Sequence, residues 1–245
     1  MVCANLNALI NRIYLGIGNS RAQDNQYFLD RIILCPRNDQ VHDINKAIFQ
    51  QFNPNAEVYM LRSVDSVSEE DGMHHAYPAE FLQQLNASRL PPALLCLKVG
   101  SPVILLRNLD PGEGLCNGTR MVVLNVRRKV LQYRIISKDR RFKDKVMLIP
   151  RIRFLPNAET LPVLFKRLQF PVRLAFAMTI NKSQGQSVVL EGWRAAITVG
   201  TNDGPLTGLL SQKVTYLFCD ELDIVSKELR SRVRQATKDV VKSEV

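Results

Sequence analysis

The alternation of apolar and polar residues near the start of the chain predicts a strand followed by a helix. Residues 30–36 (DRIILCP) form a short apolar run that ends at Pro36, a residue that cannot continue a central strand. Apolar residues then recur at helical spacing, at Val41, Ile44, Ala47 and Ile48. This spacing predicts a helix over residues 39–52, with Asn38 or Asp39 as its cap. A strand that leads through a short turn into a helix is typical of α/β proteins.

The pattern changes in the middle of the chain, where short β-type runs replace the helical spacing. Residues 79–85 predict one short helix before Pro91-Pro92. The stretch KVGSPVILLRNLDPGEGLCNGTRMVVLNV predicts two strands with turn signals at Asp110-Pro111-Gly112 and Asn117-Gly118. Two more β-type runs occupy residues 131–137 and 146–152. Four short strands with tight turns predict a small antiparallel barrel or sheet that is inserted in the α/β pattern.

The α/β pattern returns at AFAMTINKSQGQS, where residues 174–178 predict a buried strand and residues 179–186 a polar turn at its carboxyl end. Ligands of open α/β sheets bind at such ends. Gly185 permits a close backbone approach, and Lys182 and Ser183 can bind a phosphate. The same residues are also typical of a solvated β–α turn, and their chemistry alone leaves both interpretations open.

The charge of the chain favours a polyanionic partner. Lys and Arg exceed Asp and Glu by ten, and the isoelectric point is near 9.6. Residues 127–153 contain eleven Lys or Arg and two Asp. We expect the apolar members to fill one face of successive strands and the basic members to line the other. These apolar members are Val130, Leu131, Tyr133, Ile135, Ile136, Val146, Leu148 and Ile149. The basic face is equally well interpreted as a solvated sheet surface or as a nucleic-acid surface.

Cysteine usage and hydropathy argue against several other classes. The five cysteines are scattered and include no C-x-x-C pair, which argues against a zinc site or a disulfide framework and for a reducing, intracellular compartment. No apolar run reaches the roughly 18 residues of a membrane span, so we expect no membrane partner. Asparagines and Arg12 interrupt the N-terminal apolar run, which is therefore not expected to be a signal peptide.

Several longer strings resemble one family. KRLQFPVRLAFAMTINKSQGQS is similar to motif V and its approach in the PIF-type DNA helicases of superfamily one, a group that includes the helicase of Helitron transposons. RIILCPRNDQVHDIN resembles the motif IV region of that family. YPAEFLQQL, LPPALLCLKVGSPVILLRNLDPGEGLCNGTR and IPRIRF resemble its domain 2B. The resemblance covers about residues 28–187.

The resemblance implies a fold, a reaction and a partner. The fold would be α/β, a RecA-like second motor domain that carries a small antiparallel β-barrel, domain 2B. Its segments would be residues 1–76 and 156–245 of domain 2A, with domain 2B at residues 77–155. The intact family enzyme would use ATP and Mg²⁺ to move 5′ to 3′ along single-stranded DNA, and we expect it in the nucleus.

The resemblance also implies roles for individual residues. DNA phosphates would contact the polar turn at Thr179, Asn181, Lys182 and Ser183. The bound nucleotide would be sensed by Gln184, Gly185 and Gln186. Arg37 would contact the nucleotide and Asn38 the DNA, although a plain helix-cap interpretation fits these two residues equally well.

The sequence also departs from the family pattern. No G-x-x-x-x-G-K-[ST] loop for ATP phosphates occurs in the 245 residues. No Ala-x-Ser-Arg string, which ends motif VI in the family, follows Val188. Residues 215–223 (TYLFCDELD) predict a strand leading to a helix cap, and residues 220–241 a charged helix. We therefore expect no catalytic residue, no metal ligand and no stable ATP binding by this chain alone. It would be either the DNA-gripping part of a helicase or a catalytically silent nucleic-acid-binding module with no motor role, and a phosphate-binding loop in the upstream reading frame would favour the former.

Overall fold

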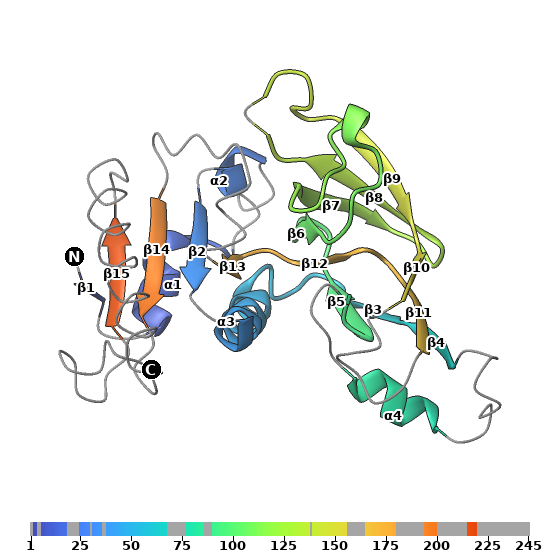
Figure 1. Cartoon of the computed structure of the whole chain (residues 1–245). Coiled ribbons are helices and arrows are strands. Elements are labelled where there is room, and N and C mark those ends of the chain that lie inside the picture. Colours follow the sequence, from blue (N-terminus) through green and yellow to red (C-terminus); the bar gives the residue numbers. More distant parts are fainter. Residues whose placement is uncertain are drawn as a thin grey trace, which may run out of the picture. The chain divides into compact units, whose positions relative to one another are not determined.

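The computed structural model describes most of the chain up to residue 179 and two strands beyond it (Figure 1). The described residues are 2–3, 6–18, 25–29, 31–35, 38–67, 77–85, 90–137, 139–155, 165–179, 194–199 and 215–219. The chain divides into two compact units. Unit 1 consists of Met1–Phe52 and Phe176–Val245, and unit 2 of Asn53–Ala175.

Unit 1 contains a five-stranded mixed sheet with the strand order β1-β15-β14-β2-β13. Its strands are β1 (Val2–Cys3), β2 (Arg31–Cys35), β13 (Ala177–Thr179), β14 (Arg194–Val199) and β15 (Thr215–Cys219). β14, β2 and β13 run parallel to one another, whereas β15 is antiparallel to β14 and to β1. The parallel centre gives unit 1 its α/β character, as the strand-then-helix pattern predicts.

The described residues of unit 1 include the helices α1 (Leu6–Ile13), α2 (Asn25–Leu29) and α3 (Asn38–Gln51). α3 buries Val41, Ile44 and Ile48, which are three of the four apolar residues that predicted it. The predicted strand at 30–36 and helix at 39–52 are therefore confirmed to within one residue at each end, as β2 and α3.

Unit 2 contains a five-stranded antiparallel sheet with the strand order β12-β6-β7-β8-β9. Its strands are β6 (Pro102–Leu105), β7 (Arg120–Val126), β8 (Val130–Ile135), β9 (Val146–Pro150) and β12 (Val172–Leu174). The first four match the four strands predicted from the sequence. The 3-10 helix η3 (Pro111–Glu113) occupies the predicted Asp110-Pro111-Gly112 turn, where the Asp110 carboxylate accepts a hydrogen bond from the Glu113 amide at 3.2 Å.

Two smaller sheets and one helix complete unit 2. β10 (Ile152–Phe154), β11 (Phe165–Gln169) and β4 (Val64–Val67) form one sheet, and β3 (Tyr59–Arg62) pairs with β5 (Leu94–Leu97). α4 (Ala79–Gln84) is the predicted short helix. One hydrophobic core includes residues of the large sheet, residues of β3 and β5, and Phe170, which lies beside β12. β3, β4, β11 and β12 lie outside residues 77–155, the range predicted for domain 2B, and they pair with strands of the same unit.

The strand predicted over residues 174–178 is wrong as a single strand. Leu174 ends β12, which pairs with β6 in unit 2, whereas residues 177–179 form β13, which pairs with β2 in unit 1. The chain passes from one unit to the other between Ala175 and Phe176, so one apolar run serves two sheets.

Alternation along β8 agrees with the predicted two-faced sheet, but β9 does not. Leu131, Tyr133 and Ile135 of β8 are buried. On β9, Val146 and Leu148 are 46% and 64% exposed, because the register pairs them with Arg134 and Gln132 on the outer face. The prediction that these two residues, and Val130 on the same face of β8, fill the buried face is therefore wrong. No helix within the described ranges is long and apolar enough to cross a membrane.

Candidate nucleic-acid interface

The carboxyl ends of two neighbouring parallel strands define the candidate site in unit 1. Thr179 at the end of β13 lies opposite Cys35 at the end of β2. The segments that follow these two strands therefore start side by side at one edge of the sheet, which is where α/β proteins bind ligands. Asn38 is the exposed first residue of α3, and Thr179 is 9% exposed.

The remaining predicted site residues lie outside the described residues. They are Arg37, Asn181, Lys182, Ser183, Gln184, Gly185 and Gln186. The structure brings together the strand ends from which these residues continue, and their assigned roles stay predictions.

The side chain of Asn45 in α3 fixes the position of β13. Its Nδ2 donates to the Ala177 carbonyl at 3.1 Å, and its Oδ1 accepts from the Ala177 amide at 2.9 Å. The Ile33 amide of β2 donates to the Phe176 carbonyl, so the polar groups of Ala177 point away from β2. Asn45, which is 6% exposed, thus supplies both bonds that another strand would make at this edge.

Aromatic rings hold the residue that precedes β13. Phe176 is fully buried, with its ring centroid 5.5 Å from that of Phe52 and 6.0 Å from those of Tyr14 and Phe28. The Tyr14 hydroxyl also donates to the Phe176 carbonyl. Burial raises the pKa of Tyr27, a further ring of this cluster, to about 12, although the nearby Arg31 opposes the shift. The start of β13 is thereby fixed from three segments of unit 1.

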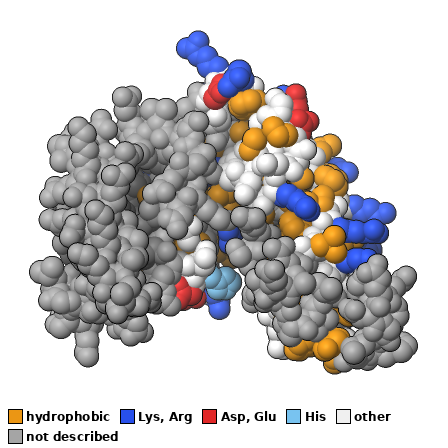
Figure 2. Space-filling model, in the orientation of Figure 1, with side chains coloured by type: hydrophobic (Ala, Val, Ile, Leu, Met, Phe, Trp, Pro, Cys, Tyr) orange, Lys and Arg blue, Asp and Glu red, His pale blue; other side chains and the backbone are white. Residues whose placement is uncertain are grey.

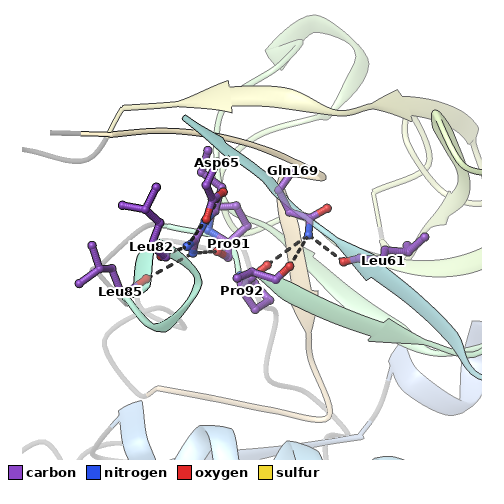
Figure 3. Close-up of polar contacts among 9 residues, drawn as sticks. Leu61, Asp65, Leu82, Leu85, Pro91, Pro92 and Gln169 are labelled. Atoms are coloured by element: carbon purple, nitrogen blue, oxygen red, sulfur yellow. Dashed lines mark hydrogen bonds and ion pairs between the residues drawn. The ribbon is translucent and has the colours of Figure 1, made fainter. Parts of the chain in front are cut away.

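A buried ion pair in unit 2 joins Arg167, in the KRLQF string that precedes the site in sequence, to Asp65 on β4 (Figure 3). Arg167 and Asp65 have side chains that are 0% and 2% exposed, and Arg167 Nη2 lies 2.8 Å from the Asp65 carboxylate. Arg167 Nε donates to the same carboxylate at 3.0 Å. The guanidinium also donates to the carbonyls of Leu82, Leu85 and Pro91. One side chain therefore connects β11 to β4 and to the end of α4.

Gln169, two residues further along β11, acts in a similar way. Its Nε2 donates to the carbonyl of Leu61 at 2.9 Å and to those of Pro92 and Ala93 at 3.2 Å each (Figure 3). Its Oε1 accepts from the Phe170 amide at 3.0 Å. Because every one of these contacts is internal, Arg167 and Gln169 position the β-sheets of unit 2.

The sequence alone predicts no role for Arg167 or Gln169. The available signal is the period-two pattern of FKRLQ, which places these two polar residues on the same face as the buried Phe165. Leu168, the apolar member between them, is on the other face and only partly buried.

The basic segment at residues 127–153 divides into paired and unpaired charges. Arg141 forms an ion pair with Asp139 at 2.8 Å, and Lys145 forms one with Glu113. Arg127, Arg128 and Lys129, by contrast, are all exposed in the turn between β7 and β8. Figure 2 shows Lys and Arg side chains beside exposed hydrophobic side chains on one face of the described surface. In unit 2, the candidate for electrostatic binding of nucleic acid is therefore the turn at residues 127–129, which is one part of the predicted basic segment.

The described residues contain no cluster of side chains that would bind a metal ion by themselves. No group of three or more His, Cys, Asp or Glu side chains lies close enough together in the described ranges to hold a metal ion. The sequence likewise contains no phosphate-binding loop of the G-x-x-x-x-G-K-[ST] type.

Comparison with protein families identifies part of unit 2. Residues 80–126 match the family described as "DNA helicase Pif1, 2B domain". The ATP-dependent DNA helicase PIF1 of Danio rerio is 32% identical over 167 residues, which are 63% of this chain and 22% of the relative. The Homo sapiens PIF1 helicase is 29% identical over the same shares. The chain thus spans about a fifth of the length of the curated relatives that it matches.

Solved structures of the same family are also similar. The Pif1 helicase of Candida albicans is 22% identical, with 74% of this chain and 47% of that chain covered at a TM-score of 0.47. A Bacteroides Pif1 helicase in complex with ADP-AlF3 and single-stranded DNA is 20% identical, with 81% and 40% covered, also at a TM-score of 0.47. The matched family and the PIF1 relatives show that the chain resembles a portion of a Pif1-family helicase that includes the 2B domain.

Proposed function

We propose, from the premise that residues 80–126 belong to the 2B-domain family of Pif1 DNA helicases, that the chain is the C-terminal part of a 5′-to-3′ DNA helicase. In this proposal unit 1 is the second RecA-like motor domain, and unit 2 carries the small β-barrel called 2B. The domain limits at residues 77 and 155, a nuclear location and kinship with Helitron helicases belong to the same proposal.

The parallel pairing of β2 with β13 is the observation that carries this proposal. It supports a site in which Asn38 and the turn after Thr179 reach the same ligand, because both segments leave one edge of the sheet. The proposed DNA contacts are Thr179, Asn181, Lys182, Ser183 and Asn38. A cationic Lys182 beside a Ser183 hydroxyl matches the needs of a phosphate.

The proposed nucleotide contacts follow the DNA contacts directly along the chain. They are Gln184, Gly185 and Gln186, with Arg37 from the neighbouring strand end. Nucleotide occupancy would change the DNA grip through this one short turn, which continues from β13, the strand that Asn45 and the aromatic rings around Phe176 hold in place. Tight binding of ATP and Mg²⁺ would depend on a second domain that carries the phosphate-binding loop.

A second candidate function is a nucleic-acid-binding module without motor activity. The observation that favours it is the lack of an Ala-x-Ser-Arg string between Val188 and residue 245 of this sequence. Both candidates bind single-stranded DNA, and they differ in their response to a supplied first motor domain.

DNA affinity as a function of salt concentration tests the shared part of the proposal. Binding of the full chain to a labelled single strand should weaken with salt, with a log–log slope of about −0.7 per phosphate neutralised. Lys182→Ala should reduce the magnitude of that slope by roughly that amount. Lys46→Ala, at an exposed position of α3, serves as the matched control and should leave the slope unchanged. A slope that Lys182→Ala does not alter would place Lys182 away from the DNA.

The same preparations should show no DNA-stimulated ATP hydrolysis. Turnover above that of a mock purification, abolished by Gln184→Ala, would show that the chain is an enzyme by itself.

A further inference from the structure

Three segments of unit 2 bring arginine side chains together through bonds to each other's backbone. Arg151 Nη1 donates to the Arg62 carbonyl at 2.6 Å, and its Nε donates to the Arg128 carbonyl at 3.3 Å. Arg107 Nη1 donates to the Arg153 carbonyl at 3.2 Å. We call Arg107, Arg127, Arg128, Lys129, Arg151 and Arg153 the arginine cluster. Its members come from the β6–β7 connection, the β7–β8 turn and the region around β10, and the bonds of Arg107 and Arg151 join these segments.

The β7–β8 turn presents three consecutive cations to solvent. The Arg127 amide donates to the Val130 carbonyl at 3.1 Å and closes the turn. Arg127, Arg128 and Lys129 are all exposed. A closed turn orients these side chains at a smaller loss of conformational entropy than an open loop would.

Within the described ranges, ion pairs do not offset the charge of the arginine cluster. None of the described carboxylates forms an ion pair with its members, although Arg141 and Lys145 nearby in sequence are each paired. Arg151 bonds to the backbone of Arg128, and the pKa of Arg151 is lowered by burial first and by the charge of Arg128 second. Neighbouring positive charges repel each other, and an anion that binds between them reduces this repulsion.

The chemistry of the cluster favours phosphate as that anion. Arginine presents a planar fork of donors that matches phosphate oxygens. The aromatic rings in the region lie beneath the guanidinium groups: Phe170 is 4.8 Å from Arg151 and Phe154 is 5.7 Å from Arg107. These rings are 0% and 6% exposed, so they cannot stack on bases.

We propose that the arginine cluster is a second DNA-binding surface, which binds backbone phosphates without reading bases. The surface belongs to unit 2 and is separate in the sequence from the turn after β13. The inference rests on the proposed function only in taking DNA as the partner. Binding here would be independent of base sequence and similar for single and double strands, because phosphates are common to both.

Charge removal at two turn residues of the full chain tests this surface. Arg128→Gln with Lys129→Gln should lower the magnitude of the salt slope on labelled oligo(dT) by about 1.4, since each lost phosphate contact removes roughly 0.7. Arg140→Gln with Lys143→Gln is the matched control, because it removes the same charge from exposed positions outside the cluster. Circular dichroism should show that both variants keep the fold.

Equal loss of slope in the two double variants would overturn the proposal, because it would show that only net charge matters. Competition by a poly-glutamate peptide as effective as that by oligo(dT) of equal charge would also overturn it, in favour of an acidic protein partner. Affinities that differ more than tenfold between oligo(dT) and a mixed-sequence strand would contradict base-independent binding.

The failure of the proposed function gives a different result. If Lys182→Ala leaves DNA binding unchanged but the cluster variant weakens it, the turn after β13 is not the DNA grip and the arginine cluster still is a DNA-binding surface. If the cluster variant leaves DNA binding unchanged but Lys182→Ala weakens it, the arginine cluster is not a DNA-binding surface and the proposed function is retained.

Discussion

Arg167 is the most completely hydrogen-bonded charge in the described part of unit 2, and its role is internal. Its guanidinium is buried against Asp65 and three carbonyls, so neither side chain of the pair is accessible to a ligand. Breaking one partner of such a pair leaves a buried charge without compensation, and this is much more costly than losing an exposed ion pair.

Asp65→Asn should therefore lower the free energy of unfolding by about 3–5 kcal/mol, measured by urea denaturation. Asp139→Asn, which removes the exposed partner of Arg141, is the control and should have little effect, although hydrogen bonds from Arg141 lower the pKa of Asp139. A midpoint for Asp65→Asn equal to that of the control would show that the buried pair is not stabilising.

Tyr27 predicts a stability change at high pH. Burial raises its pKa from 10.0 to about 12, so the folded state retains the phenolic proton that the unfolded state loses above pH 10. The stabilisation is fully present below pH 10 and is lost as the pH rises to about 12. Tyr27→Phe should flatten the fall in unfolding midpoint between pH 10 and 12. Absorbance at the tyrosinate band that shows Tyr27 ionising near pH 10 would contradict this expectation.

Among the elements, α3 has two functions, since it covers β2 and also completes the hydrogen bonding of β13 through Asn45. Asn45→Leu should leave the Ala177 amide and carbonyl buried without partners. We expect a loss of about 1–3 kcal/mol in the free energy of unfolding and weaker binding of single-stranded DNA. The exposed α3 substitution His42→Ala is the control. Unchanged DNA affinity in a destabilised Asn45→Leu variant would separate the stability of β13 from its proposed ligand role.

Local sequence patterns predicted the helices and strands better than they predicted which strands pair and in which register. The strand β2, the helix α3 and the four strands β6 to β9 follow from apolar spacing and turn residues, which are local properties. The division of residues 174–178 between two sheets depends on where the chain passes between units, and no local signal marks that point. The outward position of Leu148 depends on register with Gln132, which is a non-local property.

For the candidate site, the sequence likewise indicates a position along the chain but not the distant residues that support it. The position of the turn after β13 follows from a polar string behind an apolar strand, and the structure places its start beside the end of β2. Asn45, 132 residues away from Ala177, gives no sign in the sequence that it bonds to that strand. The polar residues Arg167 and Gln169 are inward-facing because they bond distant carbonyls, which only the tertiary structure brings together.

For the whole molecule, the pairing of strands sets the size of an independent folding unit. A fragment of residues 53–175 contains every described partner of the β6–β9 sheet and should unfold cooperatively in urea. A fragment of residues 77–155 lacks β3, β4, β11 and β12, so we expect it to lack a cooperative transition. Cooperative unfolding of the shorter fragment would support the narrower domain limits.

The neighbouring rings of Phe52 and Phe176 have a consequence for the order of folding. These residues flank unit 2, and their ring centroids are 5.5 Å apart, so the whole of that unit is a loop that must close before β13 can join β2. Closing a long unstructured loop is slow, because its entropy must be lost before any contact forms. If unit 2 folds first, it acts as a short connector and removes most of that delay. We therefore expect variants that slow unit 2 to leave the edge of β2 unpaired for longer, and to aggregate during refolding even where their final stability is unchanged.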